Sequence, residues 1–222
     1  MKIMREFIDG DGFKVPCVTI TPPDPKGAVV VVHGYGGTKE KTLGLAWRIA
    51  ENGFITGCID LRGHGEHPLD LDDDVLLDIE TAISRFKNYG EVTAIGHSFG
   101  GRFAIISSAD YAIGISPAIG ENFSNETKSN IREFKDYLVH KSHKNDLFSI
   151  LNEFNDLKEF NHDNLLLIYG TRDLPEIIIE CENLKSRNLD VIKIDNALHS
   201  DIFLLESTFK AINDKLETWY LK

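Results

Sequence analysis

The sequence predicts an α/β fold: a mostly parallel sheet of about eight strands with helices on both faces. Downstream of a proline-rich stretch at residues 21–25, short apolar runs alternate with longer amphipathic segments. This alternation is typical of a parallel sheet that helices cover on both sides. The first twenty residues differ, because apolar and polar side chains alternate around an Asp-Gly-Asp-Gly turn sequence. They predict an N-terminal antiparallel hairpin.

The individual elements follow from the same alternation. Six short apolar runs are expected to form buried strands, at residues 28–32, 54–59, 92–95, 112–115, 165–169 and 191–194. Five amphipathic segments are expected to form helices, at residues 39–51, 72–88, 99–109, 175–187 and 202–221. The acidic run at residues 72–74 favours the N-terminus of the second helix, because negative charge there compensates the helix dipole.

The chain length predicts one domain over residues 1–222, since α/β chains of this size routinely form a single core. Residues 117–164 interrupt the alternation, because they separate two expected strands by far more than the usual connection. Apolar side chains recur at helical spacing in two parts of this segment, at residues 131–138 and 147–157. We therefore expect a small helical insertion, either a cap over a functional site or a unit packed beside the sheet.

Composition narrows the function classes. The formal net charge of −11 argues against nucleic acid or an anionic membrane as a partner, because both would be repelled. The N-terminal residues run directly into polar sequence, and no apolar stretch is long enough to span a bilayer, so a cytoplasmic protein is expected. Cys17, Cys58 and Cys181 are odd in number and widely spaced, which favours reduced buried thiols over a disulfide framework.

Ser98 is the candidate nucleophile. It stands in Gly96-His97-Ser98-Phe99-Gly100, between the expected strand 92–95 and the expected helix 99–109. A strand, a sharp glycine-flanked turn and a helix start form the context of a Gly-x-Ser-x-Gly nucleophile elbow. Glycines lack a Cβ atom, so the backbone can make the strained turn that exposes the serine hydroxyl above the sheet.

A serine nucleophile requires a base that is itself oriented by a carboxylate. Asp173 follows the expected strand 165–169, and His199 follows the last expected strand. Serine, acid and histidine then occur in that chain order beyond the carboxyl ends of strands, where open α/β sheets bind ligands. The identity of the acid stays open. Asp173 could serve only as a helix N-cap, and Glu121 is then the rival carboxylate.

Histidine pairs elsewhere raise the question of a metal site. His64 with His67, and His140 with His143, have spacings that metal ligands also show. Neither pair has a matched third ligand, which a zinc site requires. The sequence therefore predicts neither a metal nor another cofactor.

Taken together, these motifs resemble those of the α/β-hydrolase superfamily, especially its small esterase, lipase-like and acyl-peptidase-like members. The resemblance covers nearly the whole chain and rests on residues 33–37, 60–65 and 96–100 together with Asp173 and His199. Within this family, residues 62–65 shape the fold near the site.

The resemblance also implies the oxyanion donors, which are the backbone N–H groups of Tyr35 and Phe99. It implies a serine hydrolase that cleaves a carboxylic ester through an acyl-enzyme intermediate. Thioesters, lactones, amides and peptides use the same residues, so the leaving group stays open. A small-molecule binding module on the same fold is the non-enzymatic alternative.

Overall fold

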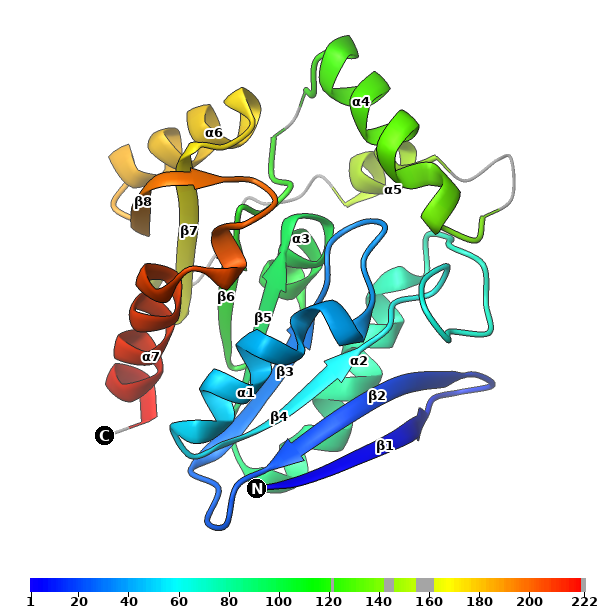
Figure 1. Ribbon diagram of the computed structural model, residues 1–222, viewed down its shortest axis with the longest axis vertical. Helices are drawn as coiled ribbons and strands as arrows, with labels where there is room; N and C mark the ends of the chain where they lie inside the picture. Colours follow the sequence, from blue (N-terminus) through cyan, green and yellow to red (C-terminus); the bar gives the residue numbers. More distant parts are fainter. Residues whose placement is uncertain (121, 142–145, 155–161, 221–222) are drawn as a thin grey trace.

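The computed structural model describes all residues except 121, 142–145, 155–161 and 221–222. Within the described residues, one eight-stranded sheet has the order β1-β2-β4-β3-β5-β6-β7-β8 (Figure 1). Its strands are β1 (Lys2–Asp9), β2 (Lys14–Thr21), β3 (Gly27–Val32), β4 (Phe54–Ile59), β5 (Val92–His97), β6 (Tyr111–Ile115), β7 (Leu165–Arg172) and β8 (Asp190–Leu198). Neighbouring strands from β4 to β8 are parallel, whereas β2 is antiparallel to both β1 and β4. The expected fold class and the N-terminal hairpin are confirmed.

Helices cover both faces of the sheet. In the described residues they are α1 (Leu43–Glu51), α2 (Val75–Phe86), α3 (Ser98–Ile106), α4 (Asn125–Lys135), α5 (Leu147–Glu153), α6 (Pro175–Ser186) and α7 (Glu206–Tyr220). Side chains of α1 and α7 belong to one hydrophobic cluster, and side chains of α2, α3 and α6 belong to the other. Successive residues of a strand point to opposite faces, so Val29 and Val31 join the first cluster while Val30 and Val32 join the second.

The second helix begins later than its acidic run predicts. The sequence favours a start at residue 72, but α2 begins at Val75, with Asp74 as its N-cap. Asp72 instead accepts a hydrogen bond of 2.6 Å from Nη1 of the buried Arg62. A charge-assisted bond to a buried guanidinium outweighs the modest benefit of another acidic residue in a helix.

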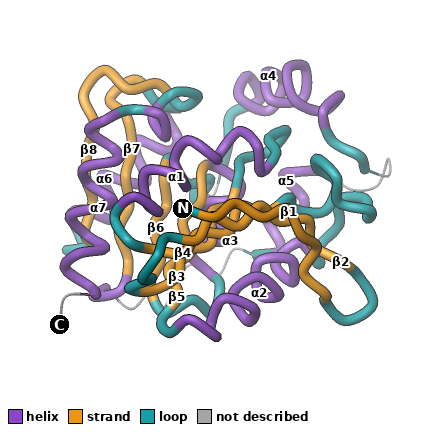
Figure 2. Tube along the Cα trace, turned by 60° about the horizontal axis from the view of Figure 1, so that its bottom comes forward, coloured by secondary structure: helices purple, strands orange, loops and turns teal. Residues whose placement is uncertain are grey.

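Two helices, α4 and α5, lie within residues 117–164. They sit together above the carboxyl ends of the central strands and far from α7, as the two views show (Figures 1 and 2). Phe134 and Tyr137, which have helical spacing in the sequence, are 61% and 78% exposed. The helical spacing of these side chains therefore predicts a helix here but not a buried helix face. Leu157, the last residue of the second expected helical part, lies outside the described residues.

The strand order brings the candidate site together. The central strand β3 lies between β4 and β5, and β6, β7 and β8 follow in order beyond β5. Because these strands are parallel, the loops that follow β3, β5, β6, β7 and β8 all emerge at the same edge of the sheet. None of the described helices is long and apolar enough to cross a membrane.

Candidate active site

The turn at Ser98 has the strained backbone that a nucleophile elbow requires. Ser98 has a φ of +53°, in the left-handed region that side chains with a Cβ rarely adopt. A Cβ at Gly96 would overlap the carbonyl oxygen of Gly100, and a Cβ at Gly100 would overlap that of His33. Both glycines are therefore required by close backbone approach, and they let β5 pass directly into α3 with Ser98 at the junction.

Ser98, His199 and Asp173 form a continuous hydrogen-bonded chain. Nε2 of His199 lies 3.0 Å from Oγ of Ser98, and Nδ1 of His199 lies 2.7 Å from Oδ1 of Asp173. In this arrangement Nδ1–H donates to the carboxylate, so Nε2 is free to accept the serine proton. Three residues from the ends of β5, β7 and β8, far apart in the sequence, are thus placed as nucleophile, base and acid require.

The carboxylate of Asp173 is buried and accepts several hydrogen bonds. Oδ1 accepts the N–H of Leu174 at 2.8 Å, and the hydroxyl group of Ser116 donates to Oδ2. Burial alone would raise the pKa of Asp173, but the bonds from His199, Ser116 and Leu174 outweigh burial and lower it. Asp173 is therefore ionised at neutral pH, as the partner of a histidine base must be.

Ser116 is a residue that the sequence analysis missed. It follows β6 directly, is fully buried and has a φ of +44°. The left-handed backbone turns its hydroxyl group toward Asp173, on the neighbouring strand β7. Its position after the expected strand 112–115, at the edge where Ser98 and Asp173 lie, is the signal that would have pointed to it.

His97 contacts the loop that carries His199. Its Nε2–H donates a hydrogen bond of 2.7 Å to the carbonyl oxygen of His199, and its ring lies 4.7 Å from the ring of Phe203. Burial lowers the pKa of His97 to about 3, so the ring is neutral in ordinary buffers. His97, which precedes Ser98, therefore helps to fix the backbone of His199.

The loop after β3 contributes Tyr35 to the site. The N–H of Tyr35 forms no hydrogen bond to any described residue, and Phe99 stands in the first turn of α3, where a backbone N–H lacks a helical partner. Tyr35 and Phe99 line the same cavity as Ser98. Two free donors thus accompany the serine, which is the composition of an oxyanion hole.

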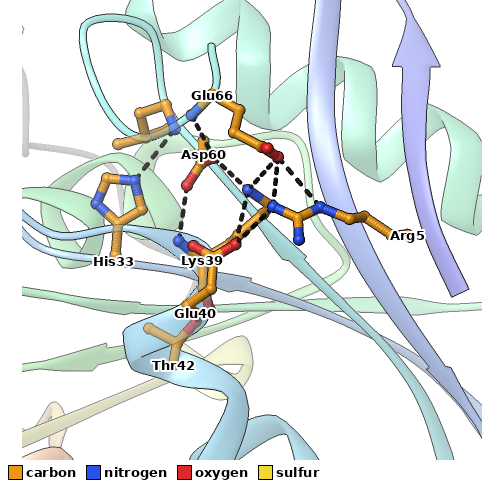
Figure 3. A network of polar contacts seen from close by, with 8 residues as sticks. Arg5, His33, Lys39, Glu40, Thr42, Asp60 and Glu66 are labelled. Atoms are coloured by element: carbon orange, nitrogen blue, oxygen red, sulfur yellow. Dashed lines mark hydrogen bonds and ion pairs between the residues drawn. The ribbon is translucent and has the colours of Figure 1, made fainter. Parts of the chain in front are cut away.

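A buried ionic network holds this loop in place (Figure 3). Lys39 is fully buried, and its Nζ lies 2.6 Å from Asp60 and 2.9 Å from Glu66. Asp60 also accepts the backbone N–H of Lys39 at 2.7 Å, while Nε2 of His33 accepts the N–H of Leu61. Burial alone would lower the pKa of Lys39, but its bonds to Asp60 and Glu66 raise it. The loops after β3 and β4 are therefore held together by charge.

A cavity of about 300 Å³ adjoins Ser98. Its walls are mostly apolar, and many of them come from the segment between β6 and β7 and from α6 with its N-cap, Leu174. The apolar side chains from these two parts are Ala118, Phe123, Ile131, Leu147, Phe148, Leu151, Leu174 and Ile177. An apolar cavity with a few polar groups on its walls is typical of a small-molecule site.

Polar contacts attach the described parts of residues 117–164 to the rest of the structure at several points, among them backbone hydrogen bonds of His140 with Gly63 and Leu71 at 2.8 Å. Near α4, Glu176 accepts hydrogen bonds from the N–H of Ser124 at 2.8 Å and from Thr127 at 3.0 Å. After α4, the Tyr35 hydroxyl donates to Asp136 at 2.7 Å. At the end of α5, Arg102 donates to the carbonyl oxygen of Phe154 at 2.6 Å.

The other residues singled out in the sequence lie elsewhere. Glu121, the rival acid, lies outside the described residues, and so does His143. His64 is buried, with its Nδ1 bonded to the carbonyl oxygen of Arg62, and His67 lies 3.4 Å from Asp78. The described part of the chain contains no group of three or more metal-ligating side chains placed to hold an ion.

Comparison with protein families identifies the chain. The model of a hydrolase family described as serine aminopeptidase, S33, matches residues 23–149, which is more than half of the chain. The chain belongs to this family. In this hydrolase the matched segment contains the Tyr35 loop and Ser98, whereas Asp173 and His199 lie beyond it. The resemblance to α/β hydrolases that the motifs indicate is confirmed.

Solved structures with the same fold include several esterases. An esterase of Pyrobaculum calidifontis is 20% identical, with a TM-score of 0.70 over 97% of this chain and 84% of that one. Est1E from Butyrivibrio proteoclasticus is 16% identical, with a TM-score of 0.71 over 98% and 99%. A soluble variant of the Saccharomyces cerevisiae monoglyceride lipase is 16% identical, with a TM-score of 0.68 over 97% and 94%. At these identities the likeness establishes the fold. No curated protein sequence matches the chain.

Proposed function

We propose that this hydrolase cleaves carboxylic esters of small or medium size, with Ser98 as nucleophile, His199 as base and Asp173 as the orienting acid. The single observation that carries the proposal is the hydrogen-bonded chain from Ser98 through His199 to Asp173, which ends beside the apolar cavity. The esterases among the structures that share the fold support an ester as the substrate.

The reaction follows from the geometry in two halves. In the first, Nε2 of His199 takes the proton of Ser98 while Oγ forms a bond to the ester carbonyl carbon. The C–O bond to the alcohol then breaks, and His199 returns the proton to the leaving alkoxide. In the second half, His199 takes a proton from water, the hydroxide attacks the acyl-enzyme, and the acid is released as Ser98 recovers its proton.

Negative charge on the carbonyl oxygen develops in both halves of the reaction. The N–H groups of Tyr35 and Phe99 are proposed as its donors, because both residues line the cavity of Ser98 and neither N–H has another role. Loss of one such donor typically slows an enzyme by about 10²-fold or more.

Residues 117–164 are proposed to act as a cap over the site. Their apolar side chains line the cavity, and their contacts with Tyr35, Arg102 and Glu176 join them to the loop after β3, to α3 and to α6. A cap of this kind excludes water from the reacting ester and limits the size of the acyl or alcohol group. The wall it forms is the part of the site on which substrate selectivity depends.

The charge of the cavity favours an ester over the free N-terminus of a peptide. An aminopeptidase needs a carboxylate to bind the α-ammonium group of its substrate. No carboxylate is found among the described residues that line the cavity, whereas Lys41 and Lys135 are. These lysines would repel an ammonium group.

The deciding experiment compares the wild type with Ser98→Ala on 4-nitrophenyl esters of increasing acyl length. Wild-type hydrolysis should be lost in Ser98→Ala, with turnover of short chains exceeding that of long chains because the cavity is small. Labelling of Ser98 by a fluorophosphonate probe should disappear in the same variant. Equal hydrolysis by both proteins would refute the role of Ser98, and absence of labelling in the wild type would favour a binding module on this fold.

A further inference from the structure

The cavity beside Ser98 is lined by positively charged side chains. Among the described residues these are Lys41 and Lys135, and no carboxylate accompanies them. Burial holds the pKa of the lining residues His33 and His97 at about 4 and about 3, so both rings are neutral at neutral pH. An apolar cavity that carries two ammonium groups selects against cationic ligands and in favour of anionic ones.

Lys135 has no partner for its charge among the described residues. It is the last residue of α4 and is partly buried, with its stem packed against Gly36 of the loop after β3. The adjacent carboxylate of Asp136 is engaged by the Tyr35 hydroxyl at 2.7 Å and by Lys141 at 2.8 Å. Burial and the nearby charge of Lys41 both lower the pKa of Lys135, as expected for an ammonium group held away from water without a counter-ion.

Lys41 contacts the same loop. Its Nζ donates a hydrogen bond of 3.2 Å to the carbonyl oxygen of Gly36. The carboxylate of its neighbour Glu40 is occupied by Lys39 and Arg5. Lys41 therefore has two donors left for a ligand, since an ammonium group has three.

Both lysines line the same cavity as Ser98. The charge of Lys135 contributes to lowering the pKa of His97, which precedes Ser98, and the charge of Lys41 contributes to lowering that of His33. Gly36, which both lysines contact, follows Tyr35, a proposed oxyanion donor. Because Lys41, Lys135 and Ser98 line one cavity, an anionic group bound by these lysines would share that cavity with the reacting part of an ester.

We propose that Lys135 and Lys41 form an anion subsite, and that the esters this hydrolase prefers carry a free carboxylate on a short apolar chain. The proposal rests on the proposed function, because it assigns the substrate of that same site. A carboxylate suits the cavity because it has one charge, whereas a phosphate dianion loses more hydration among walls such as Leu147 and Phe148. The volume of about 300 Å³ is at the small end for ligand sites, so the chain is short.

The test compares two esters that differ in one group. Monoethyl adipate carries a carboxylate where ethyl hexanoate carries a methyl group, and a pH-stat follows hydrolysis of both. The wild type should have the higher kcat/KM for the monoester. Lys135→Met keeps the length of the side chain but removes its charge, so the ratio of the two kcat/KM values should fall about tenfold.

Two further variants test whether the effect of Lys135→Met comes from loss of the positive charge at residue 135 or from a general change in the protein. Lys135→Arg keeps the charge and should retain most of the preference for the monoester. Lys185→Met removes an exposed lysine from α6, away from the cavity, and should leave the ratio unchanged. A ratio that is the same in the wild type and in Lys135→Met would overturn the subsite.

Binding to Ser98→Ala tests the subsite without relying on hydrolysis. Calorimetric titration of monoethyl adipate should give a Kd about tenfold higher in Ser98→Ala/Lys135→Met than in Ser98→Ala. Ethyl hexanoate should bind both proteins equally. If the wild type hydrolyses neither ester, the proposed function fails, and the difference in Kd alone decides the subsite. Equal Kd values for the monoester would refute it.

Discussion

The hydroxyl group of Ser116 donates a hydrogen bond to Oδ2 of Asp173, while Oδ1 of the same carboxylate accepts from His199. The two residues follow neighbouring parallel strands, β6 and β7, and both are buried. Ser116 therefore stabilises the ionised form of the acid and limits its rotation. Ser116 is not among the residues that line the cavity, and its hydroxyl group is bonded to Asp173, so we assign it a positioning role.

Replacement of Ser116 by alanine is expected to weaken both the site and the fold. Ser116→Ala should lower kcat/KM by about three- to tenfold and the free energy of unfolding by about 1 kcal/mol near neutral pH. The folded-state pKa of Asp173 lies below its ordinary value of 3.8. The stability that Asp173 contributes is thus present above that value and is lost as pH falls through the folded-state pKa.

The pH dependence distinguishes this effect from simple loss of packing. Urea unfolding of the wild type and Ser116→Ala, measured from neutral pH down to about pH 3, should show a difference that shrinks as Asp173 becomes protonated. A constant difference over the whole range would show that the hydroxyl group does not act through the charge of Asp173.

Asp173→Asn is expected to reduce kcat/KM by up to about 10⁴-fold with little change in KM. An amide at this position donates where the carboxylate accepts, so His199 is no longer held in the tautomer whose Nε2 accepts the serine proton. Hydrolysis of 4-nitrophenyl acetate measures the loss, and circular dichroism checks the fold. Glu121→Gln is the matched control and should retain activity; the reverse ranking would make Glu121 the acid.

Tyr35→Phe is expected to raise KM several-fold while kcat changes little. The substitution keeps the backbone N–H proposed for the oxyanion, but it removes the hydroxyl group that donates to Asp136 and accepts from Lys141 at 3.0 Å. Residues 117–164 should then hold the substrate less firmly. Tyr137→Phe, at a side chain that is 78% exposed, should behave like the wild type. A lower kcat at unchanged KM would instead place the hydroxyl group in the reaction.

Lys39→Met is expected to lower the free energy of unfolding by about 3 kcal/mol or more, because it leaves the carboxylate of Asp60 buried without its counter-ion. Urea unfolding measures the change. Lys210→Met removes an exposed lysine from a pair with Asp214 and should cost about 0.5 kcal/mol or less. Equal effects of the two substitutions would mean that the buried network contributes no more than a surface pair.

Local patterns were enough to predict most of the fold and the three residues of the hydrogen-bonded chain. Strand β4 has the predicted bounds, and α6 ends one residue before its predicted end. Glycines at 96 and 100 predict the turn at Ser98, because only a residue without a Cβ fits beside the Gly100 and His33 carbonyl oxygens. Chain order and strand ends were enough to select Asp173 and His199 as candidates, since parallel strands present their carboxyl ends at one edge.

Contacts between residues far apart in the chain were not predictable in this way. The pairing of Ser116 with Asp173, of Lys39 with Asp60 and of Tyr35 with Asp136 joins residues separated by 57, 21 and 101 positions. No periodicity or spacing encodes such pairs, because they depend on strand order and on how residues 117–164 dock. The sequence by itself determined which chemistry the site can hold; only the tertiary structure decided which charges surround it, because burial and pairing are properties of the packed chain.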